Sequence, residues 1–178
     1  MIAKQFQYLT FATTLASVSA FCNGADLDAA SELAVSSELS AANLLSVSNL
    51  TVVNQEGGAN NVYVRQTGQT NYTSARQDGN RNSLSVTQAG EDNIVLSSQV
   101  GDQNLSGLIQ VGYENFIDID QYGMGNTAGI SQFGMQNSAY VEEIGLLHKV
   151  HVYQSGNGLH ASVRVTGTAT TTYINQYD

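Results

Sequence analysis

The chain has 178 residues, a formal net charge of −9 and a sequence pI near 4.5, while only 12% of its residues are charged and 8% are aromatic. This composition lacks the basic stripe that nucleic-acid binding requires, so nucleic acid is excluded as an expected partner. The chain has one cysteine and no proline. It therefore cannot close an internal disulfide. Because proline is absent, every residue of a strand has a backbone N–H that can donate a hydrogen bond.

The N-terminal segment, residues 1–20, is expected to be a secretory signal peptide. A lysine precedes an apolar stretch at residues 8–21, and Val18-Ser19-Ala20 suits signal peptidase. A transmembrane anchor is the alternative, but the apolar stretch is shorter than the roughly 20 residues that a span needs. Lipid attachment at Cys22 is a second alternative, which the bulky residue before it disfavours. We therefore expect an exported chain.

Residues 21–48 form a leader ahead of the repetitive part of the chain and are rich in Ala, Ser, Leu and Glu. Their small and polar composition favours a flexible segment. A helix is the alternative, because acidic side chains near its start would meet the positive end of the helix dipole.

From residue 49 onward the sequence repeats every 11 residues. Each repeat carries a glutamine, except at Glu143 and Val165. A glycine follows two residues later in all repeats but the last, and an asparagine usually follows five residues later. Such a period indicates stacked units, because each unit can bury its apolar face only against its neighbours. The glutamines are Gln55, Gln66, Gln77, Gln88, Gln99, Gln110, Gln121, Gln132, Gln154 and Gln176. The asparagines are Asn49, Asn60, Asn71, Asn82, Asn93, Asn104, Asn115, Asn126 and Asn137. The glycines are Gly57, Gly68, Gly79, Gly90, Gly101, Gly112, Gly123, Gly134, Gly145, Gly156 and Gly167.

Each repeat predicts one β-strand followed by a four-residue turn. In the repeat from Asn60 to Gln66, the asparagine, two valines and the glutamine share parity and point to one side of the strand. Two strands can then face each other across a thin apolar core. The predicted fold is all-β, a β-solenoid of two facing parallel sheets with six coils at about 49–70, 71–92, 93–114, 115–136, 137–158 and 159–178.

Stacked coils place equivalent side chains above one another in columns. We expect the glutamine and asparagine amides to hydrogen-bond along these columns, because a buried amide without a partner is costly. The glycines are expected at the corners, where the backbone needs a positive φ.

The segments 55–66 and 121–132 resemble the curlin repeat, Gln-x-Gly-x-x-Asn-x-Ala-x-x-x-Gln, and the resemblance extends over 49–178. It implies a curli subunit that is secreted to the extracellular face of a Gram-negative cell through a dedicated pore with accessory proteins. It also implies polymerisation, with itself and a co-expressed curlin subunit, into biofilm amyloid at the outer cell surface.

Several features resemble the minor, nucleating curlin subunit. The leader is not glycine-rich, the spacing is uniform, and the last coils depart from the repeat. Because the repeat fails at this end of the chain, we expect this end to anchor the fibre to the cell or to an accessory protein. The residues expected to do so are His148, Lys149, His151, His160 and Arg164. The major fibre subunit is the alternative, because six coils are counted where the nucleator typically has five, and because the sequence ending at Asp178 resembles the major subunit's terminus.

The open ends of such a stack expose unpaired backbone groups, so growth by addition of further chains is expected. Six acidic residues could repel one another and restrain premature assembly. Ordinary solvated surface acids are the equal alternative. We also expect faster assembly near pH 5–6, where histidines gain and carboxylates lose charge. The six acids are Asp78, Glu91, Asp92, Asp102, Asp118 and Asp120.

No catalytic, cofactor or small-molecule site is expected, because no nucleophile and base occur in a recognisable motif. A metal site at His148 and His151 is not expected, because on a strand these side chains point to opposite sides. Asp118 and Asp120 lack the glycine-rich pattern of calcium-binding β-rolls. The more distant alternative function is a monomeric solenoid that binds ice or a glycan, which the irregular outward-facing residues disfavour.

Overall fold

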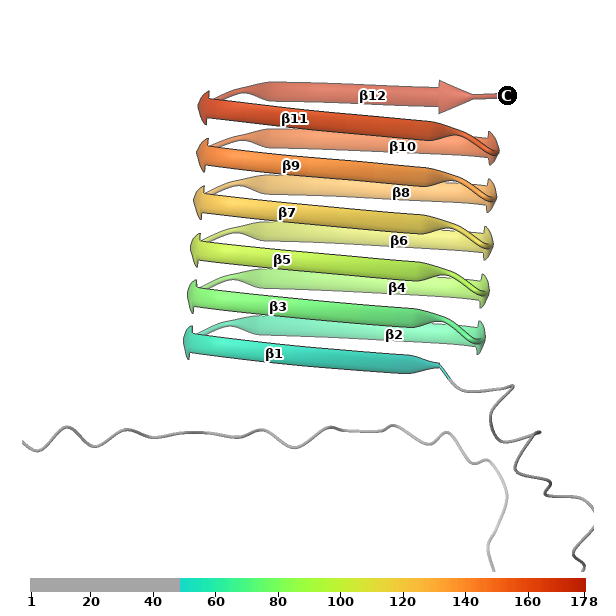
Figure 1. The fold of residues 1–178 in the computed structure, drawn as a ribbon, viewed down its shortest axis with the longest axis horizontal. Helices are drawn as coiled ribbons and strands as arrows, with labels where there is room; N and C mark the ends of the chain where they lie inside the picture. The colour runs from blue at the N-terminus through green and yellow to red at the C-terminus, as the bar shows by residue number, and fades with distance from the viewer. Residues whose placement is uncertain (1–48) are drawn as a thin grey trace, which may run out of the picture.

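Residues 49–178 are described by a computed structural model, in which they form a β-solenoid of 12 strands (Figure 1). The predicted all-β fold with six two-stranded coils is confirmed. Within this range the structure contains no helix that could span a membrane. The predicted signal peptide (1–20), the leader (21–48) and Cys22 lie outside the described residues.

The strands follow one another at a constant interval, and all but the last have nine residues. They are β1 (Leu50–Gly58), β2 (Asn61–Gln69), β3 (Tyr72–Asn80), β4 (Ser83–Glu91), β5 (Ile94–Asp102), β6 (Leu105–Tyr113), β7 (Phe116–Met124), β8 (Thr127–Met135), β9 (Ser138–Leu146), β10 (Lys149–Asn157), β11 (His160–Thr168) and β12 (Thr171–Tyr177).

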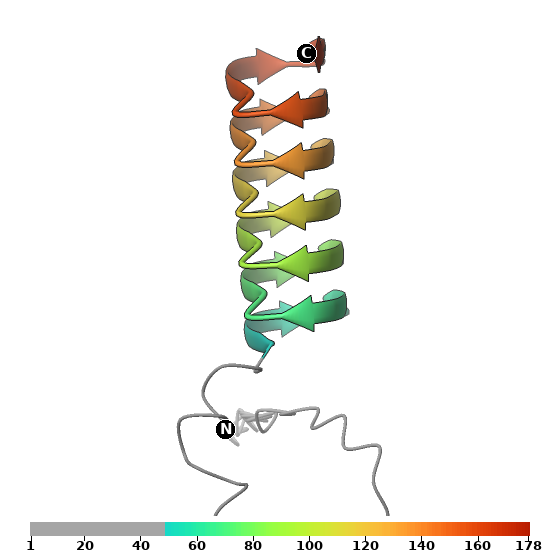
Figure 2. The ribbon, with the colours of Figure 1, turned by 90° about the vertical axis from the view of Figure 1, so that its right-hand side faces the viewer.

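The strands alternate between two parallel six-stranded sheets. The odd-numbered strands form one sheet, in the order β1-β3-β5-β7-β9-β11, and the even-numbered strands form the other, from β12 to β2. Every pair is in register with an offset of 22 residues, as in Gln66↔Gln88 and Gly68↔Gly90. Figure 2 shows the stack from its narrow side, with one coil above the next. Each coil adds about 4.8 Å along the axis, the spacing of hydrogen-bonded strands.

The core lies between the two sheets and is filled by the inward-facing positions of every strand. Burial alternates with a period of two residues, as in β7, because successive side chains point to opposite sides. Only two apolar or small side chains per strand enter this core, or three in β11 where Val165 joins Ala161 and Val163, so it stays thin. The largest apolar side chains that are fully buried are Leu84, Leu108, Ile117, Ile119 and Ile130.

The turns between strands are shorter than predicted. The sequence indicated a link at residues 67–70, but β2 extends to Gln69 and leaves two residues before β3. Gly68 lies at the penultimate position of the strand and remains paired with Gly90 of the next coil. The strand persists because a positive φ at the glycine bends the chain while the backbone keeps its hydrogen bonds to the neighbouring coil.

Candidate functional site: the side-chain columns and the ends of the stack

The glutamines form two columns of hydrogen bonds, one on each sheet. On the even-numbered sheet, each Nε2 donates to the Oε1 of the glutamine in the next coil at 2.8–3.0 Å, without interruption from Gln66 to Gln176. On the odd-numbered sheet, equivalent bonds of 2.6–2.8 Å join Gln55 to Gln121. Neutral amides therefore satisfy one another inside the stack, which removes most of the cost of their burial.

The glutamines also join the two sheets, which the sequence pattern did not indicate. Nine of them donate an Nε2 hydrogen to the backbone carbonyl 16 residues earlier, on the opposite sheet, at 3.0–3.3 Å. Gln88, for example, donates to the carbonyl of Tyr72 at 3.1 Å. Side-chain parity places the glutamines inside, but this carbonyl is defined only when the coil closes.

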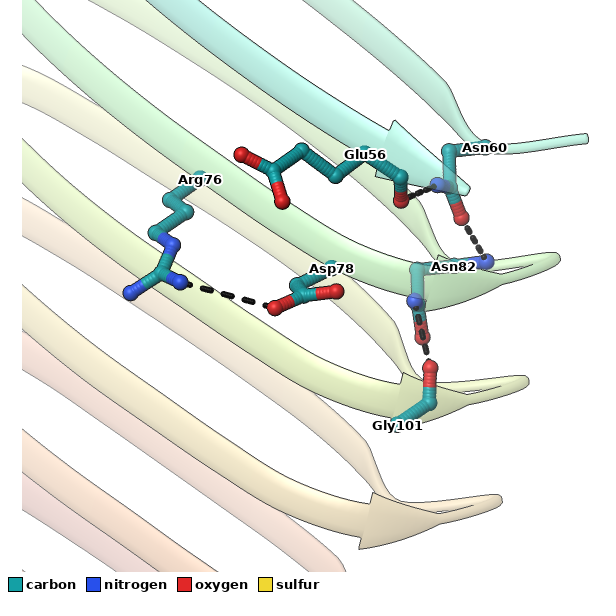
Figure 3. A network of polar contacts seen from close by, with 6 residues as sticks. All are labelled: Glu56, Asn60, Arg76, Asp78, Asn82 and Gly101. Atoms are coloured by element: carbon teal, nitrogen blue, oxygen red, sulfur yellow. Dashed lines mark hydrogen bonds and ion pairs between the residues drawn. The ribbon is translucent and has the colours of Figure 1, made fainter. Parts of the chain in front are cut away.

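The asparagines connect successive corners of the stack (Figure 3). Asn60 Oδ1 accepts a hydrogen bond from the backbone N–H of Asn82 at 3.0 Å, and Asn82 Nδ2 donates to the carbonyl of Gly101 at 2.7 Å. All nine asparagines donate to the glycine carbonyl 19 residues later, at 2.7–3.2 Å. Each asparagine thus satisfies backbone groups of the corner above it.

The repeat glycines all have a positive φ, and a second constraint acts on most of them. A Cβ atom on Gly112 would lie 1.8 Å from the carbonyl oxygen of Gly134 in the next coil. A side chain at this position would therefore separate two coils as well as strain the backbone. Two residues after Gly112, Glu114 has a φ of 53°, and the equivalent position has a positive φ in every corner although it is a glycine only at Gly125 and Gly158.

Glu143 occupies a glutamine position in the odd-numbered column and is 0% exposed. Its Oε2 accepts a hydrogen bond from Gln121 Nε2 at 2.5 Å, but its Oε1 is buried without a hydrogen-bond partner. Burial raises the pKa of this carboxyl, while the Gln121 hydrogen bond and the nearby His148 act in the opposite direction. The next residue in the column is Val165, which ends the series of hydrogen bonds.

His148 replaces an asparagine and reproduces two of its hydrogen bonds, to the backbone N–H of the next corner and to the carbonyl four residues earlier. Its Nδ1 accepts from the backbone N–H of Thr170 at 3.2 Å, as an asparagine Oδ1 does in other corners. Its Nε2 lies 3.2 Å from the carbonyl of Ile144, which requires the hydrogen on Nε2. The side chain is fully buried, whereas His151 is exposed on the outer face, so the predicted divergence of these two histidines is confirmed.

The final coil departs from the repeat at several further positions. Leu159 and Thr170 stand where asparagines are expected, and Asp178 stands in place of a glycine. Asp178 accepts a hydrogen bond from the backbone N–H of Asn157 at 2.8 Å. The column residues of coils 1 to 4 are thus all present, and every substitution falls within residues 137–178.

The structure does not bring the five expected anchoring residues into one patch. His148 is internal, Lys149 and His151 lie on the outer face of β10, and the other two lie on β11 in the opposite sheet. Arg164 pairs with Glu142 at 3.1 Å. His151 stacks on Tyr173 with ring centroids 5.2 Å apart. Over residues 49–178, no three His, Cys, Asp or Glu side chains converge as a possible metal centre.

The six acids named as possible restraints lie on outer faces and corners. Asp78 pairs with Arg76 at 3.5 Å (Figure 3). Asp120 stands beside Glu142 of the next coil. Burial raises the pKa of Asp118, and burial together with the charges of Asp118 and Glu142 raises the pKa of Asp120. Repulsion between stacked acids therefore acts at specific sites, most clearly along the outer face of β7 and β9.

Both ends of the described stack are open. Within residues 49–178, β1 and β2 have a strand neighbour on one side only, as do β11 and β12 at the other end. The core is uncovered at the first coil, where the inward-facing Val53 is 43% exposed. Unpaired strand edges with exposed apolar side chains favour addition of further strands.

The fold and the columns define a class of structural protein: a β-solenoid built from amide-laddered repeats, with ends that can accept more strands. Residues 112–145 match a family model described as the curlin associated repeat. No curated protein matches the chain. The matched repeat and the solenoid fold together support a curlin-type structural subunit.

Proposed function

We propose that the protein is a structural subunit of extracellular curli-type amyloid fibres on a Gram-negative cell. The observation that carries this proposal is the in-register stack, in which residues 49–178 leave an open sheet edge at each end. Because the offset of 22 residues is constant, a further copy can continue both sheets without a change of geometry. The matched curlin repeat supports the same function.

A second copy would fit head to tail. Its β1 would pair with β11 and its β2 with β12, which continues the order of both sheets. On the even-numbered sheet, Gln176 Nε2 would donate to Gln66 of the second copy and extend the intact column. On the odd-numbered sheet, Val165 would meet Gln55, so that column would be interrupted at the junction.

Fibre formation by the purified mature chain tests the proposal. We expect thioflavin-T-positive fibres and X-ray reflections near 4.8 Å and about 10 Å, the spacings of strands and of packed sheets. Fragments of these fibres should remove the lag of fresh protein. A chain that stays a soluble monomer for weeks at high concentration, without the 4.8 Å reflection, would reject the proposal.

We further propose that this subunit is the minor one, which nucleates a co-expressed curlin and anchors fibres at the cell surface after passage through the secretion pore. Concentration of all column substitutions in residues 137–178 supports this division. The regular coils would provide the template, and the irregular coils would contact the cell surface or an accessory protein. The major subunit remains the alternative.

Two experiments separate these roles. Substoichiometric amounts of a nucleator should abolish the lag of the co-expressed curlin subunit, whereas a chain that only co-polymerises should leave that lag almost unchanged. Deletion of residues 148–178 should preserve polymerisation in vitro and release fibres from cells. Loss of polymerisation with attachment preserved would reject the anchoring role.

A further inference from the structure

We propose that ionisation of Glu143 releases the terminal coil, residues 159–178, and that protonation of Glu143 holds this coil on the stack. The proposal concerns the folding of the solenoid. It also concerns whether the C-terminal end is available to a second copy, and this part rests on the proposed function. It starts from the buried Oε1 of Glu143, which has no hydrogen-bond partner.

The repeat indicates what this oxygen faces. Elsewhere the amide nitrogen of the column residue donates to the carbonyl 16 residues earlier, as Gln154 does to Ser138 at 3.0 Å and Gln132 to Phe116 at 3.0 Å. For Glu143, the equivalent carbonyl belongs to Thr127. A protonated carboxyl can donate to that carbonyl, as an amide does. An ionised carboxyl can only accept, so it would leave two acceptors facing each other.

The position of Glu143 in the stack decides which part of the chain responds. Glu143 lies in β9, and among the described residues β11 is the only strand of its sheet that follows. Its covering neighbour in the column is Val165, which offers no hydrogen bond. A buried charge can reach water when the last coil detaches, which breaks one column hydrogen bond, from Gln154 to Gln176. Opening on the other side would break two, from Gln121 to Glu143 and from Gln132 to Gln154. Detachment of the terminal coil therefore requires less free energy than opening on the other side.

The outward-facing charged groups around this site do not reach the Glu143 carboxyl, and only His148 lowers its pKa through charge. Asp120, Glu142 and Arg164 lie on the outer face of the same sheet, and Lys149 lies on the outer face of β10. His148, in the adjoining corner, is the one inward-facing titratable side chain nearby, and its Nδ1 is occupied by the Thr170 N–H. A protonated His148 ring could no longer accept the hydrogen bond from the Thr170 N–H. A charge on His148 would therefore cost the terminal coil this hydrogen bond.

The direction of the pH effect follows from linkage. Burial raises the pKa of Glu143 above its ordinary value of 4.5, so the folded coil binds the proton more tightly than the detached coil. The resulting stability is fully present below pH 4.5 and is lost as the pH rises through the raised pKa. Most carboxylates in proteins act in the opposite direction, because their pKa is usually lowered on folding.

Hydrogen exchange of the terminal coil between pH 4 and pH 7.5, corrected for the intrinsic exchange rate, tests this proposal. In the wild type we expect the protection factor of residues 159–178 to fall about tenfold for each unit by which the pKa is raised. Protection of the regular coil at residues 71–92 should stay constant. The Glu143→Gln variant should restore the amide and keep residues 159–178 protected at both pH values.

The matched control is Glu142→Gln, which removes the same charge from the adjacent, outward-facing position. It should retain the wild-type pH dependence. An unchanged pH dependence in Glu143→Gln, or its loss in Glu142→Gln, would overturn the proposal. The measurement applies to any folded form, soluble or in fibres. A folded chain that never polymerises would reject the proposed function alone, and this test would still be decided.

Discussion

The regular coils, residues 49–136, and the terminal coils, residues 137–178, share one backbone geometry but differ in the chemistry of their columns. In the regular coils, neutral amides act as donor and acceptor at once, so every unit satisfies the next. In the terminal coils, Glu143 and His148 can replace an amide in one protonation state only. The comparison shows that the backbone keeps its geometry when a column residue is replaced, whereas the column of hydrogen bonds is interrupted.

The largest expected effect comes from closing the space between regular coils. Gly112→Ala would place a methyl group 1.8 Å from the Gly134 carbonyl oxygen and strain a backbone with a φ of 132°. We expect a loss of roughly 3–5 kcal/mol in the free energy of unfolding, from overpacking and backbone strain together.

The matched control for this change is Gly107→Ala on the same strand, where a Cβ atom would meet nothing within 4 Å. It should alter stability by less than about 1 kcal/mol. Chemical denaturation of soluble protein, or of fibres, measures both variants. Equal losses in the two variants would show that close contact between coils does not limit stability.

Removal of one amide from an intact column should have the next largest effect. Gln110→Ala would leave Gln88 Nε2 without its acceptor at 2.9 Å and Gln132 Oε1 without its donor at 3.0 Å. We expect a loss of about 3 kcal/mol, because Gln88 Nε2, Gln132 Oε1 and the Ile94 carbonyl each lose a hydrogen-bond partner. Thermal unfolding measures the change. The neighbouring outward residue Ile109 is the control, and Ile109→Ala should cost less than about 1 kcal/mol.

Repair of the interrupted column sharpens the comparison further. Gln at both 143 and 165 would let one amide donate to the next, whereas either substitution alone lacks its partner. We expect a favourable coupling of about 1 kcal/mol in the double-mutant cycle of Glu143→Gln and Val165→Gln. Denaturation midpoints of the four proteins give the coupling. Additive effects would indicate that the columns do not act cooperatively in the terminal coils.

The smallest expected effect lies on the outer face. The pKa of Asp120 is raised by burial and by Asp118 and Glu142, so the ionised form destabilises the fold as the pH rises above its ordinary value of 3.8. Asp120→Asn should gain a few tenths of a kcal/mol at pH 7 and nothing at pH 3. Asp78→Asn, which loses an exposed ion pair with Arg76, should give no such gain. Melting temperatures at the two pH values compare them.

The architecture could be predicted from the sequence because the 11-residue period is almost invariant. The inward pairs such as Ile117 and Ile119, the stacking of repeats and the number of coils all follow from the alternation of side chains along a strand. The prediction of a four-residue turn is wrong, because the strand continues through the glycine. In the structure, Gly68 bends the strand and keeps its pairing.

The proposed anchoring residues show why the rest was not accessible. Lys149 and Arg164 are close in sequence, yet they lie on opposite sheets because one turn separates their strands. In the sequence His148 belongs to a group of basic residues, whereas in the structure it takes the place of an asparagine. The sequence carried one signal for this role, the asparagine position of His148 in the repeat, but not the acceptor and donor that meet its ring.

The sequence by itself determined the period, the side of the sheet to which each residue points, and the end of the chain at which the repeat fails. These properties are local, because the parity of a strand needs no knowledge of its neighbours. Only the tertiary structure decided which carbonyl each glutamine reaches, and that Glu143 keeps a buried oxygen unpaired. Such partners lie 16 to 22 residues away, and closure of the coil brings them within hydrogen-bonding distance.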